Sequence, residues 1–206
     1  MAGRDFGSEA ARDRVKRKIA DLEKLTSAEI VVAIQPSSGS YQHADYLVGF
    51  ALSFLSVLVF VFHPRAMRSD LFPLEHLVAF IFGAAATRYL APVRRLLSTR
   101  RLMTENVERA AKAAFVDLGV AGTRARTGIL VYVSLLERCV SVVADSGVPE
   151  AELLLAQLRI DASEAIRAAD VDGFVAALTA LGPHLAEALP RGTDDENELP
   201  DEVGAA

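Results

Sequence analysis

Four residues with chemically active side chains stand at the ends of short apolar stretches of this sequence. Glu29 begins the stretch EIVVAIQ and Thr127 begins TGILVYVS, while Asp145 ends the stretch that follows. Arg126 directly precedes Thr127. Two carboxylates with a hydroxyl group suit a hard cation such as calcium or magnesium. The pattern makes Glu29 and Asp145 candidate metal ligands, with Thr127 and Arg126 as candidate binding residues beside them.

A structural role fits the same residues. Carboxylates beside arginines form ion-pair networks that only hold the fold together. The sequence Asp-Ser-Gly at residues 145–147, placed before a helix, is typical of a turn with helix-capping hydrogen bonds. We expect Asp145 to be mainly structural and paired with Arg126, and the metal site is the alternative.

The strands that position these residues are short and apolar. Residues 29–35 predict a buried strand, and residues 127–147 predict two strands that turn near residue 136. A helix between the first and second strands favours a parallel pair, and the second and third strands form an antiparallel hairpin. The four candidate residues then reach one edge of the sheet. The opposite edge holds the SSGS loop and residues 134–138, with little reactive chemistry.

Amphipathic patterns predict helices before and after these strands. They run over residues 8–25, over 104–118 with Thr104 as its cap, from about Glu150 after Pro149, and over 171–189 with Asp170 as its cap. Strands and helices in this order predict an α/β fold. We expect a small mixed sheet of three or four strands flanked by helices.

The middle of the chain is strongly apolar. Residues 46–62, YLVGFALSFLSVLVFVF, carry no charge and nearly cross a hydrocarbon core of ~30 Å as a helix. A second segment, residues 71–91, has Glu75 near its start and Arg88 near its end. Because the connection between them is short, the two segments predict an inserted transmembrane helical hairpin. The alternative is a buried helical hairpin in a soluble protein.

Basic residues set the orientation of this hairpin. The connection holds Arg65 and Arg68, whereas the far side of the second segment holds Arg88, Arg94, Arg95, Arg100 and Arg101. The positive-inside rule then places both termini in the cytoplasm, in a multi-pass protein of the cell inner membrane. The charged N-terminus has no apolar core, so it is not a signal peptide.

This reading divides the chain into four parts. Residues 1–41 and 101–190 form the two halves of one small domain, and residues 42–100 form the hairpin with its basic juxtamembrane segment. Residues 191–206 are an acidic tail. The lipid bilayer is the partner that the hairpin requires.

Net charge, cysteine content and sequence motifs limit the classes of function that the chain can have. The net charge of -5 gives no general attraction for nucleic acid. The single cysteine, Cys139, cannot form an intramolecular disulfide and is expected to be a small core residue. The sequence has no glycine-rich phosphate loop, no Gly-x-Ser-x-Gly elbow and no aspartate-rich calcium loop.

Several pieces of the sequence together resemble the TPM domain family. They are TSAEI at residues 26–30, the phenylalanine-rich helix, TRARTGIL at 123–130 and VADSG at 143–147. The ending NELPDEV, residues 197–203, resembles a membrane-bound bacterial branch of uncharacterised membrane proteins. The resemblance implies a small α/β fold, and some members of the family are credited with acid phosphatase activity or calcium binding. This chain lacks the family's customary opening segment with an early aspartate.

Two functions follow from these observations. We favour a membrane-anchored interaction or accessory module that binds a membrane or cytoplasmic protein partner at the cytoplasmic face. The alternative is a divalent-metal-dependent phosphatase, which rests on the resemblance and on Glu29 and Asp145. If the chain is an enzyme, we expect a phosphatase with calcium or magnesium as its cofactor.

Overall fold

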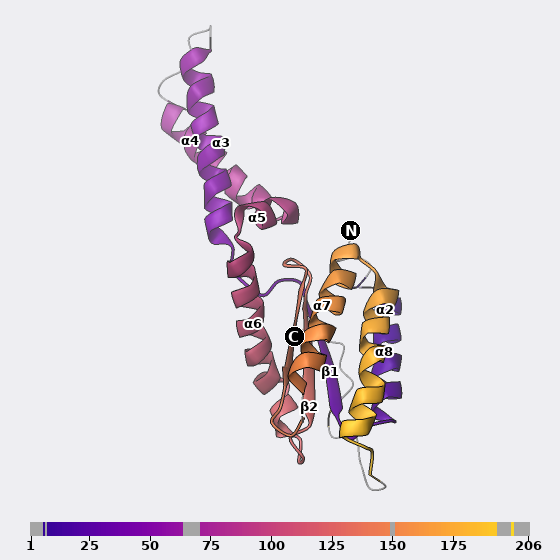
Figure 1. Ribbon diagram of the computed structural model, residues 1–206. Coiled ribbons are helices and arrows are strands. Elements are labelled where there is room, and N and C mark those ends of the chain that lie inside the picture. The colour runs from indigo at the N-terminus through magenta and orange to yellow at the C-terminus, as the bar shows by residue number, and fades with distance from the viewer. Residues whose placement is uncertain (1–5, 7, 64–70, 149–150, 193–198, 200–206) are drawn as a thin grey trace. The chain divides into compact units, whose positions relative to one another are not determined.

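The computed structural model describes residues 6, 8–63, 71–148, 151–192 and 199 of the 206-residue chain (Figure 1). The chain divides into two compact units. Met1–Gly39 and Met103–Ala206 form the first, and Ser40–Leu102 forms the second. The start expected for a helix at Pro149 and Glu150 lies outside the described residues, as does the connection that holds Arg65 and Arg68.

A three-stranded sheet lies at the centre of the first unit. Its strands are β1 (Glu29–Gln35), β2 (Gly128–Ser134) and β3 (Cys139–Ala144), in the order β1-β2-β3. β1 and β2 are parallel, and β2 and β3 are antiparallel. Runs of Val and Ile favour these strands, because branched side chains pack well on a pleated surface. The predicted α/β class, the mixed sheet and its strand pairing are confirmed.

Helices cover both faces of this sheet. They are α2 (Glu9–Glu23), α6 (Arg100–Asp117), the short 3₁₀ helix η2 (Val120–Gly122), α7 (Ala151–Ala168) and α8 (Val171–Ala188). The predicted cap of α8 is present, since the Asp170 carboxylate accepts a hydrogen bond of 2.9 Å from the Gly173 amide. The predicted start of α6 at Thr104 is wrong. The helix begins four residues earlier, where the Thr99 hydroxyl accepts a 3.3 Å hydrogen bond from the Leu102 amide.

The two faces of the sheet bury different layers of apolar side chains. Ile30, Val32 and Ile34 of β1 belong to the core formed with α2, α7 and α8. Val31 and Ala33, which alternate with them, belong to the core formed with α6 and η2. In Figure 1, α6 lies on one side of the strands, and α2, α7 and α8 lie on the other. Because successive side chains of a strand point to opposite faces of the sheet, β1 contributes side chains to both core layers.

The second unit is a pair of apolar helices, α3 (Gln42–Phe62) and α4 (Phe72–Thr87), with the short helix α5 (Ala91–Leu97). Three contacts show that α3 and α4 run antiparallel. Phe50 pairs with Phe80 (ring centroids 5.0 Å apart), Ser56 Oγ lies 3.0 Å from His76 Nδ1, and Phe60 pairs with Phe72 (4.7 Å). By length and composition α3 alone qualifies as a membrane span among the described residues, and α4 qualifies only when joined to α5.

The second apolar segment is shorter than residues 71–91, the range that the sequence predicted. α4 ends at Thr87, and the chain bends by 98° into α5. Pro92 explains the break, because proline has no amide hydrogen and fits only the first turn of a new helix. The turn brings Arg94 onto Asp45, with guanidinium–carboxylate distances of 2.9 and 2.6 Å.

Candidate functional site

Thr127, a predicted binding residue, links the starts of β1 and β2. Its hydroxyl donates a 3.0 Å hydrogen bond to the Ser27 carbonyl, and its amide donates a 3.1 Å hydrogen bond to the Thr123 hydroxyl. Its carbonyl accepts a hydrogen bond from the Glu29 amide at 3.3 Å. The Thr127 hydroxyl donates its hydrogen bond to the segment before β1, and the Thr127 carbonyl accepts from the first residue of β1. Thr127 therefore helps to hold β1 and β2 together at this edge.

Asp145 lies in the turn that follows β3. Its Oδ1 accepts a 2.7 Å hydrogen bond from the Ser146 amide, and its carbonyl accepts a 3.2 Å hydrogen bond from the Val148 amide. Arg126 Nη1 lies 3.7 Å from the same Oδ1, so the ion pair expected between these residues is present. The Arg126 side chain is 66% exposed, which limits the free energy that the pair contributes to stability. These contacts close the turn.

Glu29 and Asp145, the candidate metal ligands, stand on opposite sides of Gly128. Glu29 is paired with Gly128 across β1 and β2, and the Asp145 amide donates to the Gly128 carbonyl at 2.9 Å. Two strand spacings therefore separate their backbones, about 10 Å. A Cβ atom on Gly128 would meet the Val120 carbonyl oxygen at 2.3 Å, so the backbone of η2 covers the space above this glycine.

Metal binding at this edge stays a prediction. Among the described residues, no group of three or more His, Cys, Asp and Glu side chains is placed to hold a metal ion. Calcium takes six to eight oxygen ligands, so a pair of carboxylates would need backbone or solvent oxygens to complete the shell. The structure brings Asp145 and Arg126 together, and it places Glu29 on the far side of Gly128.

The carboxyl edge of the sheet holds a buried polar cluster that the sequence analysis missed. The Glu137 carboxylate, in the turn after β2, accepts hydrogen bonds from the Ser134 hydroxyl and from the Ser38 amide (2.9 Å). Ser37 Oγ lies 3.4 Å from the same carboxylate. Glu137 is 7% exposed and Ser134 is fully buried. The sequence analysis placed the SSGS loop and residues 134–138 at this edge, and it did not foresee that their side chains form a buried cluster.

The hydroxyl groups of this cluster form a chain that ends on the carboxylate. Ser38 Oγ lies 2.6 Å from Ser134 Oγ and 3.3 Å from the Tyr132 hydroxyl. Burial raises the pKa of Tyr132 above its usual value. Because these hydrogen bonds run from Ser37 and Ser38 to Ser134 and Glu137, the cluster holds the loop after β1 against the turn after β2. The predicted parallel pairing of the first two strands could have indicated this cluster, because the carboxyl ends of two parallel strands lie side by side.

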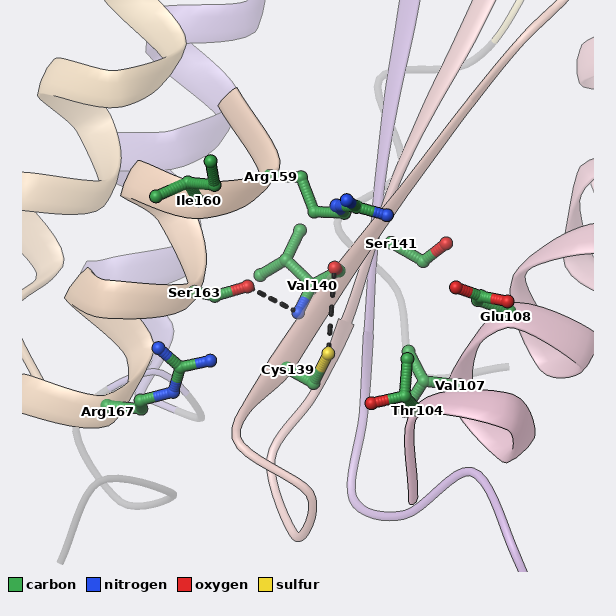
Figure 2. Close-up of a pocket in the computed structure, with 10 residues that line it drawn as sticks. All are labelled: Thr104, Val107, Glu108, Cys139, Val140, Ser141, Arg159, Ile160, Ser163 and Arg167. Carbon is green, nitrogen blue, oxygen red and sulfur yellow. Dashed lines mark hydrogen bonds between the residues drawn. The ribbon is translucent and has the colours of Figure 1, made fainter. Parts of the chain in front are cut away.

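A cavity of about 370 Å³ lies beside β3. Figure 2 shows its lining from three elements: Thr104, Val107 and Glu108 of α6, Cys139, Val140 and Ser141 of β3, and Arg159, Ile160, Ser163 and Arg167 of α7. Cys139 is half-buried at this surface and packs against the edge of the core that β1 and β2 form with α6. Burial raises the pKa of the Cys139 thiol, and the two arginines act in the opposite direction.

Comparisons with known proteins show the fold alone. No family model and no curated protein matches the sequence. A solved structure, the NMR structure of the BA42 protein from the psychrophilic bacterium Bizionia argentinensis, is similar over 97% of this chain and 94% of that chain. Its TM-score is 0.58 at 16% sequence identity.

Proposed function

We propose that this protein is a membrane-anchored module in which α3 and α4 span the bilayer. Its α/β unit serves as an interaction or accessory domain at the cytoplasmic face. The apolar surface of the two helices carries the proposal. The resemblance of residues 26–30, 123–130 and 143–147 to the TPM domain family supports the second part.

The outward surface of α3 and α4 consists of large apolar side chains. More than half of each of these side chains is exposed: Leu47, Phe50, Phe54, Leu55, Val59, Val61 and Phe62 on α3, and Leu74, Leu77, Val78, Ile81 and Phe82 on α4. Removing one such side chain from water contributes roughly 1.5–3 kcal/mol. A lipid bilayer supplies this burial for a surface that no part of the second unit covers.

The contact between the two helices fits an apolar surrounding. A Cβ atom on Gly83 would lie 3.0 Å from the Gly49 Cα atom, and one on Gly49 would lie 2.8 Å from the Phe80 carbonyl oxygen. Small residues that let two backbones approach are typical of helix pairs in membranes, where packing replaces the hydrophobic drive. The two glycines therefore support a spanning pair.

Several polar groups of the second unit lie at the end of the helix pair where α3 begins and α4 ends. Asp45 binds Arg94, and His43 Nε2 lies 3.2 Å from the Ser98 hydroxyl. Tyr89 is 89% exposed just after α4, as expected of an aromatic side chain at a membrane surface. Charges are tolerated at that depth and are costly at the bilayer centre. This end is the one that we assign to the cytoplasmic surface.

The test of the membrane anchor is extraction of the full chain from cell membranes. We expect the wild-type protein to stay in the membrane pellet under alkaline carbonate and to leave it only with detergent. Phe54→Lys/Leu58→Lys should move the protein toward the soluble or aggregated fraction, because each lysine at the centre of a span costs about 3 kcal/mol.

A matched variant controls for charge alone. Val116→Lys/Leu153→Lys places two lysines on exposed apolar positions of the α/β unit, which are 67% and 87% exposed. We expect this variant to remain in the membrane pellet. A wild-type protein that is recovered monodisperse without detergent would refute the anchor.

The orientation is tested by reporter fusions. Both termini are proposed to be cytoplasmic, since the arginines near α5 outnumber Arg65 and Arg68 of the connection. A C-terminal alkaline phosphatase fusion should be inactive, and a C-terminal green fluorescent protein fusion should be fluorescent. The opposite pair of results would reverse the topology and leave the anchor itself intact.

A further inference from the structure

One face of α7 presents two cations to the cavity beside β3. Arg159, Ser163 and Arg167 recur at intervals of four residues, which places them on one side of the helix. All three line the cavity, and both arginine side chains are exposed. A guanidinium group donates two parallel hydrogen bonds to a carboxylate or a phosphate group. The α7 wall is therefore suited to an oxyanion.

The facing wall carries the opposite charge. Thr104 and Glu108 of α6 are four residues apart and both line the cavity. Figure 2 shows Glu108 and Thr104 on the α6 side of β3, and Arg167 and Ser163 on the α7 side. A carboxylate accepts hydrogen bonds and repels a second anion. This wall favours the part of a ligand that carries hydroxyl groups.

The edge of β3 is closed to another strand at the floor of the cavity. The Val140 amide, which points away from β2, donates a 3.0 Å hydrogen bond to the Ser163 hydroxyl of α7. An added strand needs such an amide for its own ladder. The remaining floor groups are the Ser141 hydroxyl and the Cys139 thiol. The cavity therefore suits a small molecule better than an extended peptide.

We propose that this cavity binds a small organic oxyanion whose uncharged part carries hydroxyl groups, such as a sugar phosphate or a sugar acid. Arg159 and Arg167 hold the anionic group, and Glu108 and Thr104 accept hydrogen bonds from the hydroxyl groups. The volume of about 370 Å³ admits a molecule of this size, since pockets for small ligands hold ~300–1,000 Å³. Val107 and Ile160 supply apolar contacts for the carbon skeleton.

The chain provides its own reporter of occupancy. Cys139 lines the cavity and is the only cysteine of the sequence, so every thiol-specific label reports on this site. The experiment measures the rate at which N-ethylmaleimide modifies Cys139 in the full chain in detergent. Each rate is taken with and without ribose 5-phosphate, gluconate, inorganic phosphate or ribose. The ratio of the two rates removes any direct effect of a substitution on the thiol.

We expect ribose 5-phosphate or gluconate to slow the labelling about tenfold when present at ten times its dissociation constant. Ribose 5-phosphate alone would assign a phosphate group, and gluconate alone a carboxylate. Arg159→Gln/Arg167→Gln should raise the dissociation constant about tenfold or more, since each lost charge-assisted hydrogen bond costs ~1.5–3 kcal/mol. At the same ligand concentration the protection should then fall to about twofold or less. The control Arg17→Gln/Arg109→Gln removes two exposed arginines outside the lining and should keep full protection.

Several results would overturn the proposal. Equal protection by ribose would exclude a role for the charge, and equal protection by inorganic phosphate would exclude a role for the hydroxyl groups. Protection that survives in the Arg159→Gln/Arg167→Gln variant, with unchanged thermal unfolding, would exclude the arginines. Protection by an acidic peptide and by none of the small molecules would show that the edge of β3 is a docking strand.

Discussion

The α/β unit and the helical unit use the same apolar residue types in opposite ways. In α8, Phe174 is fully buried and packs edge-on against Phe6, with ring centroids 5.7 Å apart. In α3, Phe54 is 64% exposed and Phe62 is 78% exposed. In the first unit, a phenylalanine side chain stabilises the fold because folding moves it out of water and into the core. In the second unit the same gain requires an apolar medium outside the protein.

The patterns of the two helices explain this difference. The buried residues of α8 recur at spacings of three and four, as Phe174, Leu178, Leu181 and Leu185, and leave a polar side for solvent. In α3 the described buried residues are Ala44, Asp45 and Gly49, all near its start. A helix with one apolar stripe completes a core with that stripe alone, whereas a helix that is apolar all round needs an apolar surrounding on every side.

The largest effect is expected in the core of the α/β unit. Phe174→Ala should lower the free energy of unfolding by about 4 kcal/mol, because it leaves a cavity beside Phe6. Phe54→Ala, at an exposed position, should change it by less than about 1 kcal/mol in detergent. Urea unfolding of the full chain in detergent, followed by circular dichroism, measures both. Equal losses would erase the contrast between the two units.

The ion pair of the helical unit should have the next largest effect. Asp45→Ala leaves Arg94 without its carboxylate at a site where the arginine side chain is only 19% exposed. A broken pair of this kind costs about 3 kcal/mol. Thermal unfolding in detergent should show a clear loss for Asp45→Ala and a smaller one for Asp45→Asn/Arg94→Gln, which removes both charges. A double variant as unstable as the single one would refute the pairing argument.

The cluster at the carboxyl edge should have a moderate effect on stability. Glu137→Gln removes a buried charge that accepts hydrogen bonds from Ser134 and Ser38, at a cost of about 2 kcal/mol. Ser37→Ala is the control, because its contact with Glu137 is long, at 3.4 Å, and exposed serines contribute little. Denaturation curves compare the two. A loss for Ser37→Ala as large as that for Glu137→Gln would contradict the role of the buried carboxylate.

The smallest effect is expected at the turn after β3. Asp145→Ala should cost about 1 kcal/mol, because the turn loses its acceptor for the Ser146 amide. Asp145→Asn should keep most of the stability, since asparagine also accepts such bonds.

Calcium decides between this structural role and a metal ligand. Thermal unfolding is compared with and without millimolar calcium for wild type and for both Asp145 variants. We expect calcium to change none of the three melting temperatures. Stabilisation of the wild type alone would make Asp145 a ligand and would support the metal-dependent alternative.

The strands were the most predictable part of the fold. The predicted strand over residues 29–35 coincides with β1, and the pair expected within residues 127–147 is β2 and β3. Strand direction then determined which residues share an edge, so Asp145 and Arg126 were found as neighbours. The separation of Glu29 from Asp145 was less predictable. It follows from the strand order β1-β2-β3, which places Gly128 of β2 between the two residues.

The sequence by itself determined the local patterns: the short apolar strands, the Asp170 cap and the strongly apolar middle of the chain. Each depends on residues within a few positions of one another, where spacing alone specifies the interaction. Only the tertiary structure decided the Glu137 cluster and the cavity beside β3. Ser38 and Glu137 are 99 residues apart in the chain, and the cavity walls come from α6 and α7, on opposite faces of the sheet. Such contacts depend on how the elements pack in three dimensions, which no short-range pattern encodes.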